Sequence, residues 1–154
     1  MKLKSVSLLF SMLLISIIGL AQSSKQVAWN YSVKKIADKT YELHLKATVN
    51  GRYHIYAQEA GVEGPLPTQI EFTKSPLVQF DGKIKEIGKR ITKREETWGG
   101  NVNFFEKSVD FVQTIKLKAA INTNITGKIT FMVCNDSECL LPSDVNFSMP
   151  VAAK

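Results

Sequence analysis

Alternation of apolar and polar residues with a period of two dominates this chain and constrains it to fold mainly from β-strands. Every second residue is apolar between Tyr41 and Val49, and the same alternation returns between Val145 and Val151. A strand with this pattern buries one face and leaves the other wet, because successive side chains point to opposite sides. No segment of the sequence shows the period of a long amphipathic helix. An all-β protein is therefore predicted.

Further segments rich in β-branched or aromatic residues complete the predicted set of strands. They are 27–36, 53–57, 69–73, 83–87, 108–118 and 128–134. Tight-turn dipeptides at 50–51, 81–82, 99–100 and 126–127 are expected to separate strands. This many short strands in about 130 residues predict an antiparallel β-sandwich of immunoglobulin-like type.

The first twenty-one residues have the features of a signal peptide. Lys2 and Lys4 precede an apolar run at 6–20, and small residues lead to an expected cleavage after Ala21. An uncleaved membrane anchor is the weaker alternative, because the run falls short of the ~20 apolar residues that span a bilayer. Removing 1–21 leaves 22–154 as one soluble domain with its own core. Export delivers this domain to an oxidising compartment.

The charge of the chain gives no sign of nucleic-acid binding. Its formal net charge of +6 includes the two signal lysines, so the exported part carries a mild excess. The densest basic group, from Lys83 to Arg94, is mixed with Glu86, Glu95 and Glu96 and contains no interleaved aromatic residues. A solvated face is the simpler interpretation. Attraction to an acidic partner surface stays open.

The sequence contains two cysteines, Cys134 and Cys139, close together near its end. Cys134 ends the predicted strand 128–134 on the face opposite Ile129, and 135–138 forms the turn. Pro142 fits the entrance of the last strand, because a proline cannot donate to a ladder. The pair is therefore expected at a hairpin end near the surface, within reach of another protein.

Three interpretations of the pair are open at this point. A stabilising disulfide is common in exported proteins, although closing so short a loop adds only roughly 2 kcal/mol. A redox pair is the second, in which one thiol attacks a partner's disulfide and the other resolves the mixed intermediate. A zinc site with His44 and His54 is the weakest, because the histidines lie at no metal-finger spacing. No metal or other cofactor is predicted.

The stretch from Phe131 to Pro142, FMVCNDSECLLP, carries a resemblance to a known family. It resembles the strand, cysteine, acidic turn, second cysteine and proline of the amino-terminal periplasmic domain of the DsbD family of thiol:disulfide interchange proteins. Supporting stretches are 53–56, 64–68 and 98–100, and the resemblance spans 27–151. It implies an immunoglobulin-like periplasmic domain that acts as a protein-disulfide reductase.

The resemblance also implies roles for individual residues. Cys139 forms the mixed disulfide with the partner, and Cys134 resolves it. The family covers its pair with a mobile cap loop that bears an aromatic residue, and the matching loop here is 95–100, with Glu96 and Trp98. Glycines after Trp98 permit such a loop to swing. A tryptophan that plugs one end of the sandwich is the alternative.

Four more side chains are expected around the pair. His54 and Tyr56 match aromatic positions near the family's cysteines, although alternate strand residues also pack against neighbours. Asp136 and Glu138 stand beside the cysteines, and their negative charge disfavours a thiolate. This predicts a selective exchanger. Both acids can also serve the turn through bonds to backbone amides, and the two accounts are compatible.

Partners follow from the same resemblance. It implies periplasmic thioredoxin-like or disulfide-isomerase proteins as partners. The sequence shows none of the membrane-embedded or thioredoxin-like domains of full-length members, so a separate membrane electron donor is expected. The chain departs from the best-known members, which have one more residue between the cysteines. The competing hypothesis is a non-catalytic immunoglobulin-like interaction module with a permanent disulfide.

Overall fold

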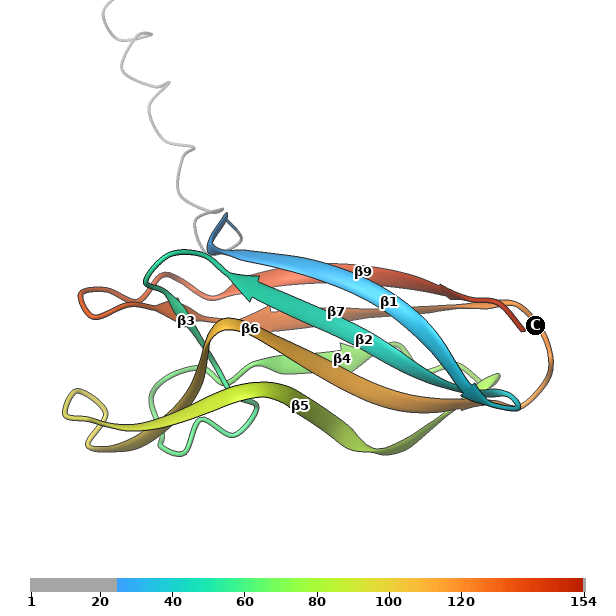
Figure 1. The fold of residues 1–154 in the computed structure, drawn as a ribbon, viewed down its shortest axis with the longest axis horizontal. Helices are drawn as coiled ribbons and strands as arrows, with labels where there is room; N and C mark the ends of the chain where they lie inside the picture. Colours follow the sequence, from blue (N-terminus) through green and yellow to red (C-terminus); the bar gives the residue numbers. More distant parts are fainter. Residues whose placement is uncertain (1–24, 154) are drawn as a thin grey trace, which may run out of the picture.

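The computed structural model describes residues 25–153, so the predicted signal peptide at 1–21 lies outside the described residues. Strands make up most of this part of the chain (Figure 1). They are β1 (Val27–Ala37), β2 (Thr40–Val49), β3 (His54–Tyr56), β4 (Gln69–Phe72), β5 (Val78–Glu95), β6 (Gly100–Leu117), β7 (Thr123–Phe131), β8 (Val133–Cys134) and β9 (Ser143–Val151). Within 25–153, no helix is long and apolar enough to cross a membrane.

The strands form two antiparallel sheets that lie one over the other (Figure 1). The larger sheet has the order β1-β2-β6-β3-β8, and β5 pairs with the remaining side of β6. The smaller sheet has the order β4-β7-β9. Along one side of β6, residues 108–116 pair with β2 and residues 104–106 pair with β3. This switch of partner carries β3 and β8 to one end of the sandwich.

The core lies between the two sheets and follows the predicted alternation. Leu45 and Ala47 of β2 are fully buried, whereas Lys46 between them and Thr48 after them are exposed. Side chains of the smaller sheet meet them from the other side, including the fully buried Ile129 and Phe131 of β7. The predicted antiparallel β-sandwich is confirmed.

Two of the predicted turns are wrong, and both contain a glycine with another purpose. Asp81-Gly82 lies inside β5, where the register with β6 shifts and Gly82 adopts a φ of 67°. It makes a bulge in a continuing strand. Thr126-Gly127 lies inside β7, where a Cβ on Gly127 would overlap the Phe147 ring and the Glu71 carbonyl. Glycine is therefore required there because neighbouring strands approach its Cα closely, and not because the chain turns.

Candidate redox site

The two cysteines form a disulfide at one end of the sandwich. Cys134 ends β8, and its Cα lies 4.1 Å from that of Cys139. Cys134 is only 2% exposed, whereas Cys139 is exposed. As the alternation predicts, Ile129, Phe131 and Val133 face the main core, while Cys134 packs with Met132 in a separate small cluster. The predicted surface hairpin therefore holds one buried and one accessible cysteine.

Residues 133–140, which we call the cysteine hairpin, are held by bonds that do not involve sulfur. The Asn135 side-chain oxygen accepts from the backbone N–H groups of Ser137 at 2.8 Å and Glu138 at 2.9 Å. The Asn135 N–H donates to the Glu138 carbonyl, and the Leu140 N–H donates to the Val133 carbonyl. Asn135 therefore supplies the side-chain bonds to the turn amides that were expected of the neighbouring acids.

A tyrosine on the adjoining loop ties this hairpin to the larger sheet. The Tyr53 hydroxyl donates to Oε1 of Glu138 at 2.8 Å. The bond to the Glu138 carboxylate raises the pKa of Tyr53, because it stabilises the protonated phenol. Tyr53 was not singled out from the sequence, since its partner lies far along the chain.

β3 forms the floor of the site. His54 pairs with Cys134 on one side and with Glu106 on the other, so these three residues lie in one row across the sheet. Directly opposite residues share a face, with their Cβ atoms about 5 Å apart. The His54 ring lies 4.3 Å from the Phe104 ring and 5.2 Å from the Tyr56 ring, centroid to centroid. The structure therefore brings His54 and Tyr56 to the disulfide.

Burial perturbs both of these rings. It lowers the pKa of His54, and the carboxylates of Glu95, Glu106 and Asp136 act in the opposite direction. Burial raises the pKa of Tyr56, and a side-chain hydrogen bond with Trp98 opposes that rise. Since an indole N–H only donates, Trp98 is the donor in this bond.

Trp98 lies in the turn 96–99 between β5 and β6, which we call the Trp98 turn. The Gly99 N–H donates to the Glu96 carbonyl at 3.1 Å, and Gly99 has a φ of 69°. The Trp98 ring lies directly against Gly64, where a Cβ would overlap it. It also packs on the cluster that contains Tyr56 and Cys134. Figure 1 shows this turn and the cysteine hairpin at the same end of the sandwich.

Both cysteines line one cavity of about 480 Å³, which we call the site cavity. Trp98, His54, Tyr56, Asp136 and Glu138, which were singled out from the sequence, line it too. Glu96 is placed differently: it contributes its carbonyl to the Trp98 turn, and its neighbour Glu95 lines the cavity. Sequence reasoning missed the other lining residues, which are Lys93, Glu95, Thr97, Asn135 and Ser137.

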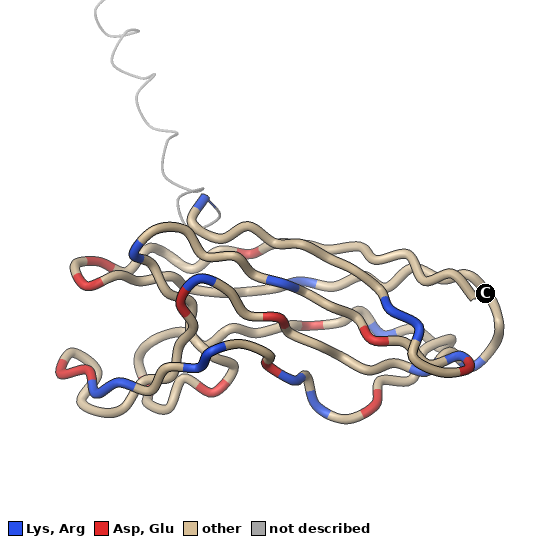
Figure 2. The backbone as a smooth tube through the Cα atoms, in the orientation of Figure 1, with Lys and Arg blue, Asp and Glu red and all other residues tan. Residues whose placement is uncertain are grey.

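Lys93 and Glu95 form an ion pair at this cavity, with Nζ and Oε1 3.1 Å apart. They pair with Val102 and Gly100 of β6, so both point to the same face of β5. Had the full length of β5 been predicted from the sequence, both residues would have been placed beside the Trp98 turn. Figure 2 shows acidic positions at the tips of the cysteine hairpin and the Trp98 turn, with basic positions along the adjoining part of β5.

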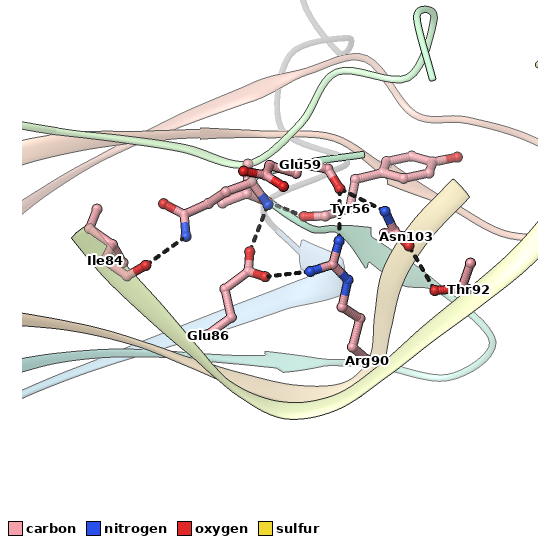
Figure 3. Close-up of polar contacts among 9 residues, drawn as sticks. Tyr56, Glu59, Ile84, Glu86, Arg90, Thr92 and Asn103 are labelled. Carbon is pink, nitrogen blue, oxygen red and sulfur yellow. Dashed lines mark hydrogen bonds and ion pairs between the residues drawn. The ribbon is translucent and has the colours of Figure 1, made fainter. Parts of the chain in front are cut away.

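A polar network holds the loop 57–68 (Figure 3). The same loop carries Gly64, which lies against the Trp98 ring. The Glu59 carbonyl accepts from Asn103 Nδ2 at 3.0 Å and from Arg90 at 3.3 Å. The Glu86 carboxylate accepts from the Gln58 N–H at 2.7 Å and lies 3.9 Å from Arg90. The loop is thereby fixed to β5 and β6, which also lead into the Trp98 turn.

The zinc interpretation requires both histidines beside the cysteines. His44 instead lies within β2, with Nδ1 2.8 Å from Oδ2 of Asp110. Its strand neighbours are Ser32 and Val112, whereas His54 pairs with Cys134. In the part of the chain that the structure describes, no three His, Cys, Asp or Glu residues gather as a metal site.

Comparison with known proteins places the chain. The profile of the family described as thiol:disulfide interchange protein DsbD, N-terminal, matches residues 22–150. The DsbD N-terminal domain of Neisseria meningitidis in its reduced form is 13% identical, with a TM-score of 0.56 over 85% of this chain and 90% of that one. The N-terminal periplasmic domain of ScsB from Proteus mirabilis is 14% identical, with a TM-score of 0.57 over 83% of this chain and 47% of that one. A comparison with curated proteins gives no match. The immunoglobulin-like fold is confirmed.

Proposed function

The chain belongs to the family of DsbD N-terminal domains, and we propose that it is a periplasmic thiol:disulfide exchange protein that reduces disulfides in partner proteins. Electrons pass through the pair Cys134 and Cys139. The observation that carries this proposal is the unequal exposure of the pair. Exposed Cys139 is open to a partner, while buried Cys134 is withheld from solvent directly behind it.

The exchange has two steps that follow from this geometry. In the reduced protein the Cys139 thiolate attacks one sulfur of a partner disulfide, and the other partner sulfur leaves as a thiolate. The Cys134 sulfur then attacks Cys139, which re-forms the bond seen in the structure and releases the second partner thiol. The partner gains two electrons and two protons, and the protein ends with its disulfide oxidised.

The hydrogen bonds within the cysteine hairpin favour a disulfide that exchanges electrons and not one that is permanent. Asn135 and the backbone hold the turn, and Tyr53 holds Glu138, without help from the disulfide. Cys134 also packs in the small cluster, outside the main core. The protein is therefore built to keep its fold when the disulfide opens.

The Trp98 turn is proposed as the cap of the site. Trp98 and Tyr56 join by a side-chain hydrogen bond, and both line the site cavity with the cysteines. An aromatic plane beside the sulfurs excludes water and stray thiols. Docking of a partner displaces this turn, which the left-handed conformation at Gly99 facilitates.

Location and partners are proposed from family membership. ScsB, one of the similar structures, carries its counterpart as an N-terminal periplasmic domain. We place this protein in the periplasm, exported by a cleaved signal peptide at 1–21. Its partners are thioredoxin-like or disulfide-isomerase proteins, and a separate membrane protein supplies its electrons.

Paired cysteine variants test the two roles with oxidised glutathione as the probe. Cys134→Ser is expected to accumulate a glutathione adduct on Cys139, because the resolving thiol is missing. Cys139→Ser is expected to form its adduct at least about tenfold more slowly, because buried thiols react poorly. Equal labelling of both variants would contradict the assigned roles.

The reduction potential of the wild-type pair tests the function itself. Exchange proteins have values between about −180 and −270 mV, whereas structural bridges lie below about −300 mV. A value in the first range supports a disulfide reductase. A value in the second identifies the alternative, a non-catalytic interaction module with a permanent disulfide.

A further inference from the structure

We propose that His54 accepts the proton of the Cys134 thiol in the resolving step and returns it to the departing sulfur of the partner. This inference rests on the proposed function and assigns a chemical role to a residue of the same site. It concerns only the second half of the exchange, after Cys139 has formed the mixed disulfide.

The position of His54 comes first in the argument. It is the direct antiparallel partner of Cys134, and both residues line the site cavity. Directly opposite side chains leave the sheet on the same face, with Cβ atoms about 5 Å apart. An imidazole extends further than a thiol from its Cβ, so it can reach the sulfur beside it. The other histidine, His44, lies in β2 against Asp110.

The resolving thiol needs a proton acceptor at this place. Cys134 is 2% exposed, so bulk water and hydroxide reach its sulfur poorly. Burial and the nearby carboxylates of Glu95 and Asp136 disfavour a free thiolate. Carboxylates are weak acceptors for a thiol proton, and Lys93 at the same cavity has a raised pKa and stays protonated. His54 is the group among the lining residues with an ordinary pKa near neutrality.

The electrostatic surroundings fit His54 for taking up and losing a proton. Burial lowers its pKa, so the ring is neutral at neutral pH and ready to accept. The imidazolium that forms is stabilised by carboxylates on three different elements: Glu95 of β5, Glu106 of β6 and Asp136 of the cysteine hairpin. Lys93 of β5 opposes it. The remaining charged and titratable neighbours at the adjoining cavities are Arg52, Tyr53, Tyr56, Lys107 and Glu138.

The ring is also held in place and connected to solvent. Phe104 lies beside its face, with 36° between the planes, and Tyr56 meets it at 89°. A second cavity of about 400 Å³, lined by Arg52, Glu106 and other residues, also borders His54, and we call it the side cavity. His54 lines both cavities, so its ring borders the cysteines and also a second hollow at the surface.

The step balances as follows. The proton of the Cys134 thiol moves to the neutral His54 ring, and the Cys134 sulfur attacks the Cys139 sulfur. The bond between Cys139 and the partner breaks, and the partner sulfur leaves with the electron pair. The His54 imidazolium then gives its proton to that thiolate. His54 ends neutral, and the two electrons have passed to the partner.

The chromogenic disulfide dithiobis(nitrobenzoate) separates the two halves of the reaction. Reduced protein releases one thionitrobenzoate when Cys139 attacks and a second when Cys134 resolves the adduct. In His54→Asn the second release is expected to slow by about tenfold or more at neutral pH, the low end of general-base effects. The first release is expected to stay within about twofold of wild type.

The pH profile of the second release gives the readout that a structural role would not change. In wild type the rate falls as pH drops through the lowered pKa of His54, and it is level above that point. In His54→Asn the rate climbs steadily with pH toward that of wild type, because hydroxide must deprotonate Cys134. His54→Phe, which keeps an aromatic ring beside Phe104 and Tyr56, is expected to behave like His54→Asn.

Controls keep the outcomes distinct. His44→Asn removes the other histidine, away from the site, and is expected to retain the wild-type profile. Unchanged second-release rates and profiles in both His54 variants would overturn the inference. Equal slowing of both releases would also overturn it, because that result indicates lost packing. Absence of the first release in wild type would instead count against the proposed function.

Discussion

The hydroxyl of Tyr53 donates to the carboxylate of Glu138 across 2.8 Å and joins the cysteine hairpin to the loop that precedes β3. Glu138 is the residue immediately before the accessible Cys139. The bond therefore fixes the position of the negative charge on the residue next to the exposed cysteine. It also limits how far the hairpin can move relative to His54, which follows Tyr53 in the chain.

Tyr53→Phe removes this bond and leaves the ring. We expect faster backbone amide exchange in residues 135–139, with little change elsewhere, because only the hairpin loses an attachment. Hydrogen exchange followed by NMR measures the effect residue by residue. Tyr31→Phe is a matched control, since the Tyr31 hydroxyl lacks a hydrogen-bond partner in the structure. Unchanged exchange in the hairpin of Tyr53→Phe would show that the bond does not restrain it.

The same bond should lose its effect at high pH. Glu138 raises the pKa of Tyr53 above 10.0, so folding favours the protonated phenol. The restraint is fully present below the unfolded value and is lost as pH rises through the folded value. NMR titration of the tyrosine rings is expected to show a raised pKa for Tyr53 in wild type. In Glu138→Gln the pKa of Tyr53 is expected to return toward its ordinary value. An unshifted Tyr53 in wild type would contradict this.

The backbone of the loop below Trp98 offers a way to displace the Trp98 ring, the proposed cap, without changing that residue. Gly64 has a φ of 135°, and a Cβ there would overlap the Trp98 ring. Gly64→Ala is expected to push Trp98 away from the site cavity, alter its fluorescence and speed reduction of the disulfide by small thiols. Backbone strain adds a loss of stability of about 1 kcal/mol or more.

Gly82→Ala is the control for that strain. Gly82 has a φ of 67° in the β5 bulge, but nothing lies within 4 Å of a Cβ placed there. This variant should lose similar stability and keep the wild-type rate of disulfide reduction. Equal rates in Gly64→Ala and Gly82→Ala would show that Trp98 does not restrict access to the sulfurs.

Alternation revealed β2 and β9 in the sequence because each buries one face against the core. β1 was recognised instead from its content of β-branched and aromatic residues. β6 was only partly recognised, since Phe111, Val112 and Gln113 are buried in succession and the alternation is lost. β5 was mostly missed for the opposite reason: it pairs only with β6, and charged residues occupy much of its length. A strand that buries both faces or neither face shows no alternation of apolar and polar residues, so the sequence pattern does not reveal it.

The site was partly visible for a different reason. The family resemblance, not the spacing of the cysteines, pointed to Trp98, His54 and Tyr56, and all three line one cavity. The contact of Tyr53 with Glu138 spans 85 positions in the sequence, so no local pattern reports it. The packing of Gly64 under Trp98 likewise exists only once the loop 57–68 has folded back onto the Trp98 turn.

The network in Figure 3 should influence the site from a distance. Asn103 donates to the Glu59 carbonyl and accepts from the Thr92 hydroxyl at 2.7 Å. Asn103→Ala is expected to cost about 1–3 kcal/mol for the two bonds and to increase exchange in the loop 57–68. Asn124→Ala, which loses one bond to Ser148 in the smaller sheet, serves as the control. If only Asn103→Ala speeds disulfide reduction, the loop supports the cap; equal rates would refute that role.

Opening the disulfide should leave the sandwich intact. Cys134 is not part of the main core, and the hairpin bonds of Asn135 and Tyr53 persist without the bridge. Reduction is therefore expected to lower the free energy of unfolding by only about 2 kcal/mol, the value for a loop this short. Chemical denaturation with and without a reductant, followed by far-ultraviolet circular dichroism, measures the difference. A protein that exchanges electrons must survive each cycle in both forms, so unfolding upon reduction would favour the permanent disulfide of an interaction module.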